Sequence, residues 1–155
     1  MSEARDDRVY DATLKGSYDV SSESRSMDSA GHIELSLPAD SRYMRLARLV
    51  ASGVATTSGL PLEEVEDFRI AVDELCATLI EMGDGQPVIL QFDVASDTLV
   101  VSARTAVSDP ADVDADRLSL SRQILDVVTD GHGINELDGH VELTARKLVR
   151  SGGVG

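Results

Sequence analysis

Three regularly spaced arginines are the side chains in this sequence that most clearly indicate a contact chemistry. Arg42, Arg45 and Arg48 recur every three residues, which places them on one slowly drifting face of a helix. Residues 31–60 hold three basic and two acidic side chains, a net charge of +1. A guanidinium pairs with a carboxylate through two parallel hydrogen bonds. The arginines therefore predict a protein-binding face; the alternative is that they are solvated or pair with acids of the next helix.

The other reactive side chains show no pattern typical of a catalytic or metal site. Cys76 falls on an apolar stripe, so we expect a buried structural thiol, and a single cysteine excludes an internal disulfide. His32, His132 and His140 share no metal-ligand spacing, so no metal site is predicted. The Gly-His-Gly run at 131–133 resembles a phosphate loop only in composition, and we expect a turn there.

Composition and charge exclude several classes of function. The 155 residues include 14 Lys and Arg against 28 Asp and Glu, a formal charge of −14. This charge argues against binding to nucleic acid and to anionic membranes, which both reward clustered cations. Aromatic residues make up only 3%, so the core must be aliphatic. The length suits one domain, and no signal peptide or membrane span is visible, so we expect a cytoplasmic protein.

Apolar periodicity predicts one α+β domain. Residues 1–30 are polar and aperiodic, so we expect a disordered tail, followed by a folded domain over 31–150 and a flexible end at 151–155. The remaining pattern predicts a strand at 33–37, helices at 42–57 and 61–82, strands at 88–94 and 98–104, an acidic loop at 107–116, a helix capped by Ser119, and strands at 134–137 and 141–148. This order predicts a two-layer sandwich with helices on one face of a mixed, mostly antiparallel sheet.

The first two helices should be held by apolar stripes that face the sheet. The expected stripe of the first helix is Leu46, Leu49, Val50 and Val54. The expected stripe of the second is Val65, Phe68, Val72, Leu75, Cys76, Leu79 and Ile80. The second stripe is the longer, so the helix at 61–82 is the most clearly predicted element of the chain.

Three stretches resemble the RsbW/SpoIIAB family of bacterial anti-sigma factors. They are IELSLPA at 33–39, IAVDELC at 70–76 and VELTAR at 141–146. Active members read roughly I-A-V-S-E-A-C-T-N in the central helix, and A-V-D-E-x-C occurs in the actinobacterial anti-sigma-F type. The resemblance covers about residues 32–149. It implies the Bergerat (GHKL, histidine-kinase-like ATPase) fold and a protein that sequesters a sigma factor; active members also phosphorylate a serine on an antagonist.

The resemblance also implies where a nucleotide site would lie. Active members carry a general-base Glu and, one helical turn later, an Asn that binds Mg²⁺. Glu74 matches the Glu, but Thr78 stands at the Asn position and offers a poorer ligand. The family's D-x-G-x-G motif falls on residues 105–112, where Asp109 matches the Asp and both glycines are missing. Its G-x-G motif falls on residues 117–121, again without glycine.

These departures predict a degenerate ATP pocket at Glu74, Thr78 and Asp109 and no kinase activity. Weak binding of ATP and Mg²⁺ through the surviving shape stays open, and so does the view that Glu74 is an ordinary solvated helix acid.

The family resemblance implies a stress- or development-type sigma factor as the partner, with release by a STAS-type anti-anti-sigma antagonist that competes for a face including Arg45. A homodimer is also expected. The alternatives are an active RsbW-type serine kinase and a nucleotide-sensing module.

Overall fold

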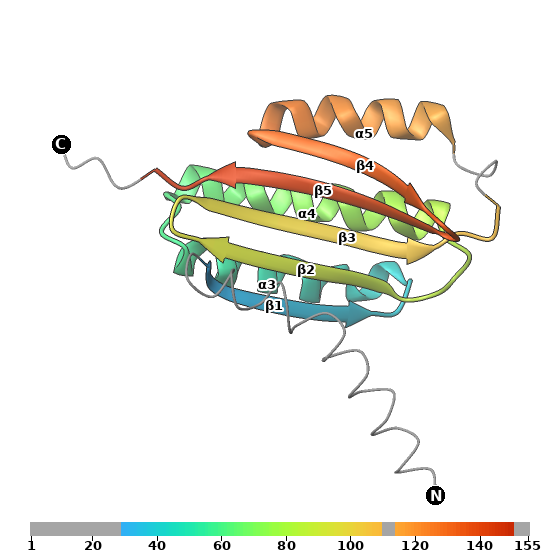
Figure 1. The fold of residues 1–155 in the computed structure, drawn as a ribbon, viewed down its shortest axis with the longest axis horizontal. Helices are drawn as coiled ribbons and strands as arrows, with labels where there is room; N and C mark the ends of the chain where they lie inside the picture. The colour runs from blue at the N-terminus through green and yellow to red at the C-terminus, as the bar shows by residue number, and fades with distance from the viewer. Residues whose placement is uncertain (1–28, 110–113, 151–155) are drawn as a thin grey trace, which may run out of the picture.

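The computed structural model describes residues 29–109 and 114–150. It consists of an antiparallel sheet with helices on one face (Figure 1). The elements in chain order are β1 (Ser29–Leu37), the 3₁₀ turn η1 (Ser41–Tyr43), α3 (Met44–Thr57), α4 (Leu62–Met82), β2 (Val88–Ala95), β3 (Thr98–Ala106), α5 (Ala115–Val128), β4 (Gly131–Leu137) and β5 (His140–Leu148). The described strands lie in the order β1-β2-β3-β5-β4.

The two-layer α+β prediction is confirmed, with one difference in the sheet. All four strand pairings are antiparallel among the described residues, so the sheet is not mixed. Residues 1–28 of the expected tail and the expected flexible end at 151–155 lie outside the described residues. Ser29 and Ala30, which were assigned to the tail, already belong to β1.

Helix α4 forms the centre of the core, and its predicted stripe is buried apart from Ile80, which packs against the core. It crosses behind the middle of the sheet, with α3 on one side and α5 on the other (Figure 1). Phe68 and Leu75 are fully buried, and the Phe68 ring lies 6.1 Å from that of Phe92 on β2. The predicted burial of Cys76 is confirmed, and this burial raises the pKa of its thiol to about 12.

No helix in the described residues is long and apolar enough to cross a bilayer.

The predicted stripe of the first helix is right at its valines, since Val54 is buried and Val50 packs against the core, and wrong at its two leucines. Helix α3 buries Ala47, Ala51 and Ala55 together with Val54, whereas Leu46 and Leu49 are 44% and 69% exposed. Alanine lets the backbones of two helices approach closely, and the neighbour here is α4. The hydrophobicity pattern ranks leucine above alanine, so it extended the predicted stripe onto the exposed face at Leu46 and Leu49 and omitted the buried alanines.

Helix α5 begins earlier than predicted. Its N-cap is Asp114, whose Oδ1 accepts hydrogen bonds from the backbone N–H groups of Asp116 and Arg117. Asp114 was expected in the acidic loop and Ser119 at the cap, but an aspartate satisfies the free N–H groups of a first turn equally well. Residues 117–121, expected just before the helix, therefore lie inside it.

The Gly-His-Gly run at 131–133 is the start of strand β4 rather than a turn. Gly131 pairs with Arg146 across β5, and a Cβ on Gly131 would lie 2.9 Å from Arg146 Nη2. That atom is the end of a flexible side chain, so a larger residue at position 131 would need only a shift of the arginine. The turn itself follows at Asp138 and Gly139, where Gly139 has a φ of 70°.

Candidate functional site

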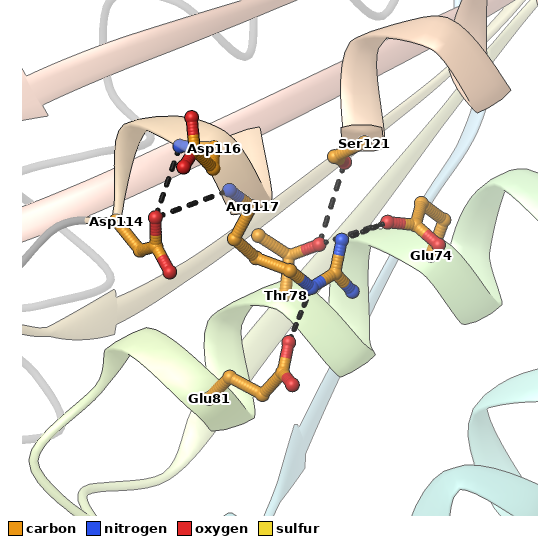
Figure 2. Close-up of polar contacts among 7 residues, drawn as sticks. All are labelled: Glu74, Thr78, Glu81, Asp114, Asp116, Arg117 and Ser121. Carbon is orange, nitrogen blue, oxygen red and sulfur yellow. Dashed lines mark hydrogen bonds and ion pairs between the residues drawn. The ribbon is translucent and has the colours of Figure 1, made fainter. Parts of the chain in front are cut away.

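An ion-pair network joins α5 to α4 at the helix positions that the family resemblance singled out. Arg117 Nη1 on α5 donates to Glu74 Oε2 on α4 at 2.6 Å, and Arg117 Nε donates to Glu81 (Figure 2). Glu74 and Glu81 lie two helical turns apart on one face of α4, so a single guanidinium spans both. The side chains of Arg117 and Glu74 are only 18% and 12% exposed. Glu74 is therefore not an ordinary solvated helix acid.

Two hydroxyl groups complete this network. Thr78 Oγ1 donates to Glu74 Oε2 at 3.1 Å and lies 3.3 Å from Ser121 Oγ on α5 (Figure 2). Thr78 and Ser121 are both buried. We call Glu74, Thr78, Glu81, Arg117 and Ser121 the α4–α5 polar cluster. Within the described part of the chain, every buried side-chain nitrogen and oxygen has a hydrogen-bond partner.

The cap of α5 sets the position of both side chains that α5 contributes. Asp114 fixes where the helix begins, and its carboxylate holds the backbone N–H of Arg117 itself. Ser121 follows Arg117 by four residues, so the two side chains point from the same face of α5. The sequence analysis missed Arg117, Glu81 and Ser121. The available signal was Asp114 itself, because aspartate is a preferred N-cap residue at the start of a helix.

Electrostatics hold Arg117 in its charged form. Burial, the largest single influence, acts to lower the pKa of Arg117, but its hydrogen bonds to Glu74 and Glu81 outweigh burial and raise the pKa overall. The negative charge on Glu74 is thus balanced by a fixed cation from the same chain. Glu74 Oε2 thus already accepts hydrogen bonds from a guanidinium and a hydroxyl of the same chain.

The remaining predicted pocket residue lies elsewhere. Asp109 is exposed just after β3, next to residues 110–113, which lie outside the described residues. The structure thus brings Glu74 and Thr78 together, and Asp109 is not one of the α4–α5 polar cluster. No glycine occurs from residue 86 to residue 130, so every residue of this region carries a side chain where the family's nucleotide motifs have glycines.

The three arginines do not share one helical face. Arg42 lies in η1, before the α-helix begins, and its guanidinium pairs with Asp40 at 2.7 Å. Arg48 Nε donates to Asp73 Oδ1 on α4 at 2.8 Å, so it pairs with an acid of the next helix. Arg45 is exposed and makes no hydrogen bond or ion pair with any residue in the described ranges.

Arg45 lies among exposed leucines. Leu49 lies four residues after Arg45 and three residues after Leu46. All three side chains point away from the buried alanines of α3. We call Arg45, Leu46 and Leu49 the α3 outer face. Exposed leucines beside an unpaired cation are typical of a surface that contacts another protein.

The histidines form local pairs. His32 Nδ1 lies 2.7 Å from Asp93 Oδ1 on the sheet, and His132 Nε2 lies 2.6 Å from Asp126 Oδ1. His140 Nδ1 lies 3.1 Å from the Asp138 carbonyl oxygen. No group of three or more His, Cys, Asp or Glu suited to a metal ion occurs among the residues that the structure describes.

Comparison with known proteins gives the family. The model of the histidine kinase-like ATPase domain matches residues 37–142. The chain is 33% identical over 116 residues to the serine-protein kinase RsbW of Bacillus subtilis, covering 71% of this chain and 68% of that protein. It is 32% identical over 121 residues to the RsbW of Halalkalibacterium halodurans, covering 72% and 74%.

A solved structure supports the fold. A chain in the crystal structure of the SiaB–SiaC complex from Pseudomonas aeruginosa superposes with a TM-score of 0.55 at 13% identity, covering 88% of this chain and 96% of that one. The likeness at this identity concerns the fold alone. The family model and the sequence matches show that this chain belongs to the histidine kinase-like ATPase domain family, as an RsbW-like member.

Proposed function

We propose that this protein is an anti-sigma factor that acts by stoichiometric binding. It holds an alternative sigma factor of the stress or development type away from RNA polymerase, and an anti-anti-sigma antagonist of the STAS type releases it. The RsbW-like family membership supports a role in partner switching. The proposal places the protein in the cytoplasm, where sigma factors act. The expected homodimer stays a prediction, which sedimentation equilibrium of the full chain tests.

The observation that carries the proposal is that side chains of α5 already contact both Glu74 and Thr78. Kinase activity would require Glu74 to accept a proton and the residue at position 78 to bind Mg²⁺ next to ATP. Glu74 is instead paired with Arg117, and Thr78 is buried against Ser121. ATP and Mg²⁺ do not fit these residues as they stand, because the side chains of α5 fill the side of α4 that a nucleotide would face. Binding of a partner needs none of this chemistry.

The α3 outer face is the proposed site of partner contact. Arg45 supplies a cation for a carboxylate on the partner, and Leu46 and Leu49 supply apolar area that the fold itself leaves exposed. Arg42 and Arg48 extend the positive charge along the same segment, although their guanidinium groups are held by Asp40 and Asp73. The sigma factor and the antagonist compete for this face.

A phosphorylation assay tests the proposal. The tagged full chain captures its partners from the source cell, mass spectrometry identifies them, and the recombinant antagonist is then incubated with the protein, Mg²⁺ and labelled ATP. We expect a stable complex with a sigma subunit and no phosphoserine on the antagonist, while RsbW of Bacillus subtilis with its own antagonist serves as the positive control. Robust phosphoserine formation contradicts the proposal.

A second candidate is an active serine kinase. The identity of about one third to proteins named serine-protein kinases favours it, and so does the retained Glu74. Glu74→Gln separates the two candidates, because it abolishes phosphorylation by a kinase and leaves stoichiometric binding of the sigma factor intact. Calorimetry with ATP and Mg²⁺ addresses a nucleotide-sensing module, for which micromolar affinity is required and which we do not expect.

Net charge provides a further test of partner binding. A formal charge of −14 steers an acidic protein towards the basic surfaces with which a sigma factor meets DNA and polymerase. The association rate should therefore fall as ionic strength rises. A rate that stays flat from low to high salt would show that the acidity serves solubility only.

A further inference from the structure

A cavity lies between α5 and the sheet, next to the α4–α5 polar cluster, with which it shares Ser121. It has a volume of about 230 Å³, is partly open to solvent, and is enclosed by α5 and the strands β4 and β5. Its walls are mainly aliphatic and come from Leu118 and Leu125 on α5, Ile134 on β4 and Leu143 on β5. The wall residues all belong to well-packed elements, so the cavity is part of the folded domain.

The size of the cavity sets the size of an occupant. An apolar cavity of about 150 Å³ is known to stay dry and to accept benzene. A cavity of about 230 Å³ therefore accommodates one ring or one branched chain with a short polar extension. A nucleotide is larger than this space, although the cavity adjoins the pocket that the family resemblance implies, through Leu118 and Ser121 of residues 117–121.

Charge at the cavity narrows the chemistry further. Arg122 on α5 and His132 on β4 are the charged or titratable residues of the lining. Asp126 stands four residues after Arg122, the spacing at which a helical acid can pair with an arginine. Asp126 is instead paired with His132. Arg122 makes no hydrogen bond or ion pair with any residue in the described ranges. An arginine without a carboxylate partner beside an aliphatic cavity, in a chain with twice as many acids as bases, favours an anionic occupant.

We propose that this cavity binds a small organic anion that consists of one apolar ring or branched chain bearing a single carboxylate. The apolar body lies against Leu118, Leu125 and Leu143, and the carboxylate pairs with Arg122 at the open side. Ser121 belongs both to the cavity lining and to the α4–α5 polar cluster. A bound ligand therefore contacts the same helix that Arg117 holds against α4. This inference is independent of the proposed anti-sigma function.

Titration of the isotope-labelled full chain with 3-phenylpropionate, followed by amide NMR, tests the site. We expect saturable shifts confined to residues 118–125, 132–134 and the neighbourhood of Leu143, with a dissociation constant on the order of 0.1–1 mM for a ligand of this size. The neutral analogue 3-phenylpropanamide should bind at least about tenfold more weakly, because it offers no charge to Arg122.

Three variants distinguish the carboxylate site from general adsorption. Arg122→Gln should weaken binding at least about tenfold, and Leu118→Phe should abolish it by filling the cavity. Arg104→Gln is the matched control, since Arg104 alternates with the buried residues of β3 and lies on the face of the sheet away from α5. It should bind as the native chain does.

Several outcomes overturn the proposal. They are the absence of saturable shifts at about 10 mM ligand, equal affinity for the acid and the amide, and unchanged affinity in Arg122→Gln. Because Arg122 is exposed, the Arg122→Gln variant should keep the NMR spectrum of the folded protein. A loss of the ligand-induced shifts in this variant therefore reports on binding rather than on folding.

Discussion

The α4–α5 polar cluster and the α3 outer face treat arginine in opposite ways. Arg117 is largely buried and donates to two carboxylates of its own chain, whereas Arg45 is exposed and has no partner in the described ranges. The difference extends to the neighbours, because Thr78 is enclosed beside Arg117 while Leu49 lies open beside Arg45. One region has its contacts satisfied within the fold, and the other offers its contacts to a partner.

This contrast predicts different responses to mutation. Removing one member of an enclosed ion pair leaves the other charge without compensation, so the free energy of unfolding falls. An exposed charge contributes little to folding, but its reversal at an interface brings like charges together and weakens binding. Substitutions in the cluster should therefore change stability, and substitutions on the α3 outer face should change affinity.

The largest expected effect is on partner binding by Arg45→Glu. Charge reversal at the centre of the proposed contact should weaken the complex with the sigma factor by at least about 100-fold. The free energy of unfolding should change by no more than about 0.5 kcal/mol, because Arg45 is exposed. Calorimetry and urea denaturation measure the two quantities. Arg150→Glu, at another exposed arginine, is the control; retained affinity in Arg45→Glu would move the interface elsewhere.

Arg117→Ala comes next and should act on stability. We expect the free energy of unfolding to fall by about 2 kcal/mol, between the values typical of exposed and of buried ion pairs. In a double-mutant cycle, combining Arg117→Ala with Glu74→Gln should cost less than the two single changes together, because both break the same contact. Urea denaturation measures the cycle. Additive effects, or a loss in sigma-factor affinity as large as that of Arg45→Glu, would remove the distinction between the two regions.

Cys76 tests the apolar interior between the two regions. Burial raises the pKa of its thiol from 9.0 to about 12, so the folded state favours the neutral form. The resulting stability is fully present below pH 9 and is lost as the pH rises towards 12, by about 1.4 kcal/mol per pH unit. Urea denaturation at pH 8, 9 and 10 measures this slope. The same series on Cys76→Ala separates it from other alkaline titrations, and equal slopes in both proteins would contradict the assignment.

The smallest expected effect is that of Leu49→Ser on stability. A leucine that is 69% exposed contributes little to the core, so the free energy of unfolding should change by no more than about 0.5 kcal/mol. Leu75→Ala, on the buried face of α4, is the contrasting variant and should lose about 2–5 kcal/mol. A large loss in Leu49→Ser would mean that the α3 outer face is packed in solution, as in a homodimer.

Much of the fold was predictable because its strongest signals are local. The stripe of α4, the hairpin between β2 and β3 and the burial of Cys76 all follow from periodicity and residue type. Helix α3 was predicted in its place, but its predicted stripe was wrong at Leu46 and Leu49. Hydrophobicity ranks leucine above alanine, while close contact between two helices selects alanine at positions such as Ala51.

The sequence alone determined the family resemblance, the departure at Thr78 and the presence of an arginine at position 45, because residue identities and short spacings are sufficient for these. Tertiary structure alone decided which arginine is held and which is exposed. Arg117 and Glu74 are 43 residues apart, and no periodicity relates positions on two different helices. Their contact exists because Asp114 sets the start of α5 and α5 then packs on α4. Arg45 points outward from α3 and has no such neighbour in the described ranges.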